Sequence, residues 1–197
     1  MLPLSKAAAI ARIIMPNDIP GFPTISVGGE TFFDISHIVT PNRYLRSRTN
    51  GLANHHSVTG QHYATMAAEV EHIKAINAYH IQQEYGGFGY NGIVFESGRV
   101  YVVGNGLGGR AHVAYRNHEL EGLCWVGNFQ ANNVPLGIIL GAARWHVAKF
   151  RQHGLKPVRG HREWAVAGWE TACPGANGMA AIPIVLRAAV AYASKGA

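Results

Sequence analysis

Residues 123–154, LCWVGNFQANNVPLGIILGAARWHVAKFRQHG, contain the clearest local patterns of this chain. The first seven, residues 123–129, have the apolar and aromatic composition of a β-strand. Pro135 then stands at a helix start, apolar residues recur at helical spacing after it, and Gly154 follows as a helix stop. This stretch predicts a strand followed by a long amphipathic helix.

Further strands and helices are expected on both sides of this stretch. They are a helix over 64–84, paired strands over 92–96 and 99–103, short strands over 52–54 and 156–159, and a last helix over 179–193. Strands and helices mix without strict alternation. The sequence therefore predicts an α/β (α+β) fold, with a mixed central sheet of about five to six strands flanked by helices.

The first 50 residues differ from the rest and offer little chemistry. A short amphipathic helix is expected over 6–15, several prolines follow it, and a glycine turn at 27–30 predicts a hairpin. We interpret residues 1–50 as an N-terminal extension packed on a single domain of residues 51–197.

Composition limits the class of protein. Of 197 residues, 48% are hydrophobic and only 14% are charged, which favours a packed core over disorder. No apolar run reaches the length of a membrane span, and the N-terminus does not read as a secretory signal. We therefore expect synthesis in the cytoplasm without a signal peptide and no membrane span. Two cysteines are too few for a disulfide framework.

The net charge of +6 is concentrated in two basic clusters. They are Arg43, Arg46 and Arg48, and then Arg144, Lys149, Arg151, Lys156, Arg159 and Arg162. Such clusters are either solvated faces or a surface for an acidic partner. No nucleic-acid-binding signature accompanies them, so we expect no specific nucleic-acid partner.

Several common catalytic motifs are missing or incomplete. The chain has no nucleophile elbow and no HExxH motif. Its GxGxxG pattern at 104–109 is not followed by a helical pattern, so a glycine-rich turn explains it better than a dinucleotide site. The two aspartates, Asp18 and Asp34, both lie in the extension, which disfavours an aspartate-based triad.

His55, His161 and Cys173 stand out among the residues that can bind a metal. Each follows a strand-like segment or lies in a turn ordered by Pro and Gly. Two imidazoles and one thiolate make a tetrahedral zinc set with one open corner, as in catalytic sites. The alternative is a buried, apolar thiol and two histidines that bridge polar groups of the core.

Six short stretches occur in one order within residues 52–190. They are His55-His56-Ser57, Gly89-Tyr90-Asn91, Gly98-Arg99-Val100-Tyr101, Arg110-Ala111-His112 with Asn117, residues 122–129, and Gly160-His161-Arg162 followed by Thr171-Ala172-Cys173-Pro174-Gly175. In this order they resemble the zinc-dependent N-acetylmuramoyl-L-alanine amidases, which share a fold with peptidoglycan recognition proteins and many phage endolysins.

The resemblance implies roles for individual residues. It makes His55, His161 and Cys173 the zinc ligands. Tyr90 matches a tyrosine that faces the metal-bound water and the scissile carbonyl, and Thr171 matches a position that helps to polarise that carbonyl.

The resemblance also implies a substrate groove. His112 and Asn117 match residues that contact the muramyl-peptide, and we expect His56 at the same groove. The spacing from His161 to Cys173 is longer than usual, which predicts an inserted turn over residues 163–170.

The activity implied is that of a peptidoglycan hydrolase. It would cleave the amide between N-acetylmuramic acid and L-alanine with a Zn2+-activated water, as a monomer that reaches the bacterial cell wall after release, like an endolysin. The alternative is a recognition module that binds peptidoglycan without cutting it. In that class the metal cysteine is lost, commonly to serine, so the presence of Cys173 favours an enzyme.

Overall fold

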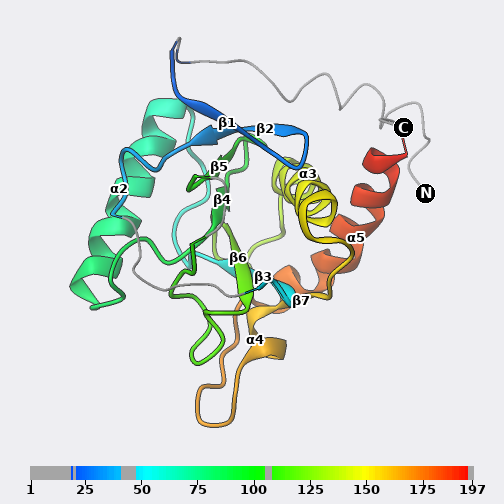
Figure 1. Ribbon diagram of the computed structural model, residues 1–197. Helices are drawn as coiled ribbons and strands as arrows, with labels where there is room; N and C mark the ends of the chain where they lie inside the picture. The colour runs from blue at the N-terminus through cyan, green and yellow to red at the C-terminus, as the bar shows by residue number, and fades with distance from the viewer. Residues whose placement is uncertain (1–18, 20, 41–47, 105–107, 195–197) are drawn as a thin grey trace.

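The computed structural model describes residues 19, 21–40, 48–104 and 108–194. Within these ranges seven strands form one sheet in the order β1-β2-β5-β4-β6-β3-β7 (Figure 1). The elements are β1 (Thr24–Val27), β2 (Glu30–Asp34), β3 (Gly51–His56), α2 (Met66–Gln82), β4 (Gly92–Val94), β5 (Val100–Val102), β6 (Leu120–Trp125), α3 (Leu136–His153), β7 (Val158–Gly160), α4 (His161–Trp164) and α5 (Ala176–Ala193). The expected mixed α/β architecture is confirmed, with one or two more strands than predicted.

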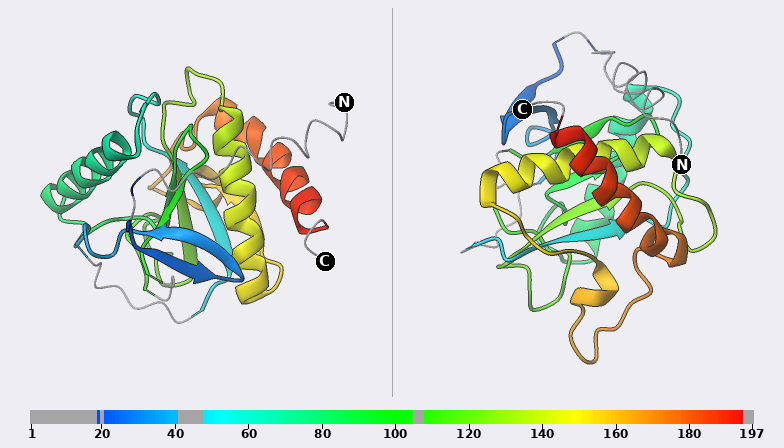
Figure 2. Two further views of the ribbon diagram at one scale, coloured as in Figure 1. Left: turned by 90° about the horizontal axis from the view of Figure 1, so that it is seen from above. Right: turned by 90° about the vertical axis from the view of Figure 1, so that its right-hand side faces the viewer.

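The sheet is sandwiched between helices. Helix α2 lies on one side, and α3 and α5 lie together on the other (Figures 1 and 2). Alternation along β6 shows how both faces are buried, because Leu123 and Trp125 join the cluster under α3 while Cys124 joins the cluster under α2. Strand β6 is thus buried on both faces, as a central parallel strand should be.

The predicted hairpin exists and belongs to the central sheet. Strand β1 pairs with β2 in antiparallel fashion, and β2 continues the sheet by pairing in parallel with β5. The turn requires glycine, since Gly28 has a φ of +55° and a Cβ there would lie 2.0 Å from the carbonyl oxygen of Ala148 in α3. The hairpin supplies the additional strands and ties part of residues 1–50 to the domain. The helix expected over 6–15 lies outside the described residues.

Helix α3 begins and ends as predicted. Pro135 precedes its first residue, and Gly154 ends it with a φ of +73°. Strand β6 begins three residues before the predicted start at Leu123, because Leu120 and Glu121 pair with the first residues of β3. The short apolar pattern does not include Glu121, whose charge is fully buried.

Strand β3 is buried along its whole length, although Leu52 and Ala53 are its only aliphatic side chains. At Gly51 the ring of Trp164 occupies the side-chain space, and a Cβ there would lie 2.5 Å from it. The indole nitrogen of Trp164 donates a hydrogen bond to the carbonyl of Leu52 at 3.2 Å. The missing side chain is therefore replaced by an aromatic ring from α4.

Helix α5 is the one helix in the described part of the chain whose length and apolar composition would allow it to cross a membrane. Here it packs beside α3 (Figure 2). Its inner face, which includes Ile182 and Val185, is buried in the core that the two helices share with the sheet.

Candidate functional site

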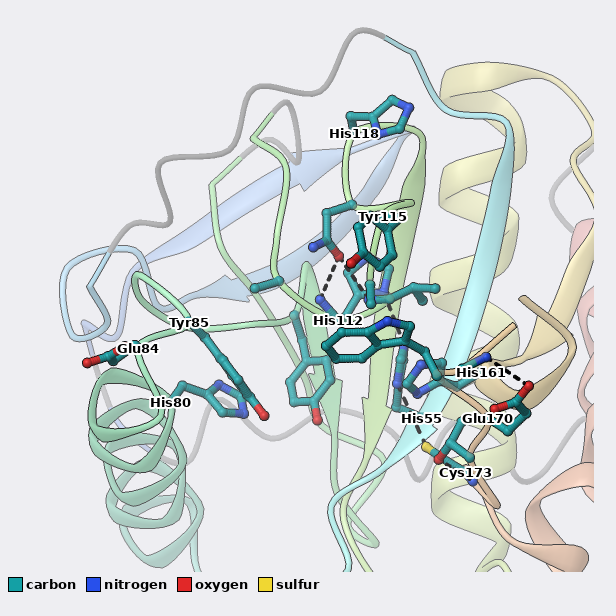
Figure 3. A pocket seen from close by; sticks show the side chains of 18 residues that line it. His55, His80, Glu84, Tyr85, His112, Tyr115, His118, His161, Glu170 and Cys173 are labelled. Atoms are coloured by element: carbon teal, nitrogen blue, oxygen red, sulfur yellow. Dashed lines mark hydrogen bonds between the residues drawn. The ribbon is translucent and has the colours of Figure 1, made fainter. Parts of the chain in front are cut away.

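Three of the predicted site residues converge at one end of the sheet. One ligand atom each from His55, His161 and Cys173 lies within 4.8 Å of the others (Figure 3). His55 is near the carboxyl end of β3, and His161 follows Gly160, the last residue of β7. Because the two strands are parallel and Asn54 pairs with Gly160, the two imidazoles become neighbours, with ring centroids 4.5 Å apart.

Cys173 is brought back to this edge by the loop that follows α4. The backbone N–H of Arg162 donates to the carbonyl of Cys173 at 2.9 Å, and the Arg162 guanidinium donates to the carbonyl of Ala172 at 2.8 Å. The backbone N–H of His56 donates to the Cys173 sulfur at 3.4 Å. The Sγ atom then lies 3.8 Å from Nδ1 of His55.

Burial sets the protonation states of the three side chains. It lowers the pKa of His55 well below the usual value, and the nearby His161 lowers it further. Burial also lowers the pKa of His161 to about 4 and raises the pKa of Cys173 to about 11. At neutral pH both imidazoles are therefore neutral, and a metal that binds there displaces a proton from the thiol.

The donor set fits a tetrahedral metal ion. Zinc binds imidazole nitrogen at about 2.0–2.1 Å and thiolate sulfur at about 2.3 Å, so that tetrahedral donors lie roughly 3.3–3.6 Å apart. The separation of 3.8 Å between His55 Nδ1 and Cys173 Sγ is within a few tenths of an ångström of this range. Across the described ranges, no other group of His, Cys, Asp or Glu is arranged in this way.

Tyr90 lies beside the three potential ligands. Its ring centroid is 5.3 Å from that of His55 and 5.3 Å from that of His80. Burial raises the pKa of Tyr90 well above its usual value, and the nearby Cys124 and Cys173 raise it further. The phenol therefore keeps its proton at neutral pH and has an O–H that can donate a hydrogen bond.

Thr171 lines the same pocket and lies two residues before Cys173. Its hydroxyl oxygen accepts a hydrogen bond from the Cys173 backbone N–H at 3.1 Å. The contact orients the hydroxyl and leaves its own proton free to donate.

The three residues expected to contact substrate have different positions. The pocket is lined by His112 and Asn117 but not by His56. Asn117 accepts the backbone N–H of His112 at 2.9 Å and so orders the loop. Nδ1 of His56 accepts the backbone N–H of Phe129 at 3.1 Å, and the ring is 8% exposed. We therefore assign His56 to support of the site rather than to substrate contact.

The pocket encloses about 870 Å³ and includes residues that the sequence analysis did not select. One wall is formed by His80 in the last turn of α2 and by Glu84 and Tyr85 just after the helix (Figure 3). Another wall is the exposed pair of Tyr115 and Trp169. Trp169 belongs to the predicted insertion at 163–170, which spans the last two residues of α4 and most of the loop after it. The sequence contains one hint that His80, Glu84 and Tyr85 lie near the site. Only the short Gly86-Gly87 link separates them from Tyr90.

Three of the six residues of the second basic cluster form ion pairs within the molecule. Arg144 and Arg151 pair with Glu30 at 3.1 and 2.8 Å. Lys149 is 2% exposed and pairs with Glu121 at 2.8 Å. These three cations therefore stabilise the fold by pairing with buried or half-buried carboxylates.

Comparisons with known proteins agree with this geometry. Residues 45–176 match the family model described as N-acetylmuramoyl-L-alanine amidase. A peptidoglycan-recognition protein of Drosophila melanogaster is 29% identical over 125 residues, which are 61% of this chain and 65% of that protein's length.

Two solved structures share the fold. Bumblebee PGRP-SA superposes with a TM-score of 0.65 at 22% identity, over 75% of this chain and 88% of that one. The endolysin amidase LysCS from Clostridium intestinale gives a TM-score of 0.55 at 20% identity, over 66% and 76% of the two chains. The family model covers most of the chain, including the three converging residues up to Cys173. The chain therefore belongs to the N-acetylmuramoyl-L-alanine amidase family.

Proposed function

We propose that this protein is a zinc-dependent amidase that cleaves the bond between N-acetylmuramic acid and L-alanine in peptidoglycan. The convergence of His55, His161 and Cys173 on one side of a pocket is the observation that carries the proposal. A recognition module has no need of three metal-binding side chains in this arrangement, whereas a hydrolase that activates water does.

The residues beside the metal ligands have complementary tasks. His55, His161 and Cys173 would hold a zinc ion, which when bound would supply Lewis acidity to activate water and polarise a carbonyl. The Thr171 hydroxyl donates a hydrogen bond to the carbonyl oxygen as negative charge develops on it; a preorganised donor of this kind contributes about 3–4 kcal/mol. Tyr90 holds its proton and positions the reacting groups by hydrogen bonding.

The pocket is large enough for a muramyl-peptide. Its volume of about 870 Å³ lies in the upper part of the usual range for ligand sites, ~300–1,000 Å³. Peptidoglycan as substrate is supported by family membership and by the name of the Drosophila relative. We also propose an endolysin-like action on the cell wall after release of a monomer made in the cytoplasm.

The proposal is tested by incubating purified protein with bacterial sacculi and measuring newly exposed α-amino groups of alanine. Release is expected with the zinc-loaded protein, is lost on chelation and returns on addition of Zn2+. Cys173→Ser and His161→Ala are expected to reduce release to background. His62→Ala, which removes an exposed histidine outside the pocket, is the matched control and should retain activity.

The same experiment separates hydrolysis from recognition. Alanine release that survives chelation or the Cys173→Ser substitution contradicts the zinc mechanism. Sedimentation of the protein with sacculi without any release of alanine, at a measured zinc content near one per chain, supports the recognition module instead.

A further inference from the structure

The imidazole of His55 contacts a different group through each ring nitrogen. Nδ1 faces Cys173 Sγ at 3.8 Å, and Nε2 lies 3.1 Å from Nδ1 of His112. Figure 3 shows His112 on the far side of His55 from the sulfur. One nitrogen therefore faces the proposed metal position, and the other faces a second histidine.

The contacts of His112 determine where the protons lie. Its Nε2 is 3.2 Å from the carbonyl oxygen of Leu120, which can only accept a hydrogen bond. With neutral rings, Nε2 of His112 carries the proton and Nδ1 accepts. The hydrogen bond from His55 must then come from its Nε2–H, which leaves a free lone pair on His55 Nδ1.

The ring of His112 is held firmly enough to fix this placement of protons on the two imidazoles. It is 8% exposed, and its backbone N–H donates to Oδ1 of Asn117 at 2.9 Å. The ring also covers Gly122 of β6, where a Cβ would lie 2.8 Å from ring atoms. Rotation of His112 away from His55 would break the contact with the Leu120 carbonyl.

We propose that His112 is a positioning residue that selects the Nε2–H tautomer of His55 and presents the Nδ1 lone pair of His55 to the metal. This inference rests on the proposed function for the identity of the metal centre. It changes the role that the sequence suggested for His112, from a substrate contact in the groove to the partner of a metal ligand. Such partners typically alter metal affinity by about 10- to 100-fold.

The first test is the tautomer of His55 in the metal-free protein, read from long-range 15N–1H correlations of the imidazole. We expect protonation at Nε2 in the wild type. Protonation at Nδ1 would overturn the inference whatever the protein binds. His161→Ala provides the assignment control, because it removes a neighbouring histidine signal and leaves His112 in place.

The second test is zinc affinity, measured by competition with a chromophoric chelator. His112→Leu is expected to bind Zn2+ about 10- to 100-fold more weakly. His112→Asn, which keeps an acceptor near the former Nδ1 position, should recover part of the loss. His62→Leu, at an exposed histidine outside the pocket, should bind like the wild type. Equal affinity in His112→Leu and wild type refutes the positioning role. Failure of the wild type to bind zinc instead refutes the proposed function, while the tautomer measurement still decides the hydrogen-bond order.

Discussion

His146 in α3 is expected to make the fold sensitive to mild acid. The side chain is fully buried, and its ring stacks on Phe150 with centroids 6.4 Å apart. Burial lowers the pKa of His146 to about 3, against a smaller opposing effect of the Ala142 carbonyl. In the unfolded chain the same group titrates near 6.5. Between these values the unfolded state binds more protons, so the free energy of unfolding falls as the pH falls.

The size of the effect follows from the two pKa values. Lowering the pH from 7.5 to 5.5 should cost about 1.4 kcal/mol through His146 alone, because the unfolded state gains a proton that the folded state does not. This figure depends almost entirely on the unfolded pKa, since a folded pKa of about 3 is far below pH 5.5. Below pH 3 the full contribution would approach about 5 kcal/mol, because each tenfold difference in proton affinity between the two states is worth about 1.36 kcal/mol.

The assay is urea denaturation of wild type and His146→Leu at several pH values from 7.5 to 5.5. Other buried histidines add to the pH dependence of both proteins, so the difference between the two curves isolates His146. We expect the variant to lose about 1.4 kcal/mol less than wild type over this range. Trp145→Phe on the same helix is the packing control and should shift the curve without changing its slope. Parallel curves for wild type and His146→Leu would refute the reasoning.

Substitutions at three further positions test the site and the strand beneath it. Thr171→Val should lower kcat for alanine release by about 100- to 1,000-fold while Thr171→Ser retains most of it; similar rates for both variants would remove the hydroxyl from the mechanism. Trp169→Ala removes a side chain that is 56% exposed at the pocket wall. It should raise KM for a muramyl-peptide by about 5- to 20-fold with little change in kcat. An unchanged KM would show that substrate does not reach this wall. Gly51→Ala places a Cβ 2.5 Å from the Trp164 ring and should lower the free energy of unfolding by about 1–3 kcal/mol in urea titrations, whereas a neutral result would mean that α4 can shift at no cost.

The parts of the fold that were predictable from the sequence are those with local causes. Helix α3 has a proline start, a helical apolar period and a glycine stop, and all three signals lie within or next to its own 18 residues. The β4–β5 hairpin likewise needs only two apolar runs and a tight turn. These features depend on neighbours along the chain, so a single sequence is sufficient to find them.

Pairing over long distances in the sequence was less predictable. A glutamate such as Glu121 is normally expected on the surface. Here its carboxylate is neutralised inside the core by the ammonium group of Lys149 from α3, at an N–O distance of 2.8 Å. The basic cluster was open to two interpretations for the same reason. Arg144 and Arg151 pair with Glu30, which lies more than 100 positions away in the sequence. Charge counts cannot show which cations are already paired within the fold.

The two adjacent histidines of β3 show how strand geometry divides the work of one motif. Successive side chains point to opposite faces, so His55 enters the pocket while the ring of His56 accepts the Phe129 N–H elsewhere. Both residues nevertheless contact the sulfur of Cys173. The backbone N–H of His56 donates to Sγ at 3.4 Å, and Nδ1 of His55 lies 3.8 Å from the same atom. A shift of β3 by one residue in register would therefore exchange the two rings and remove both contacts at once. The parallel pairing of β3 with β6 and β7 sets the geometry of the metal-binding cluster as directly as the identity of the three side chains does.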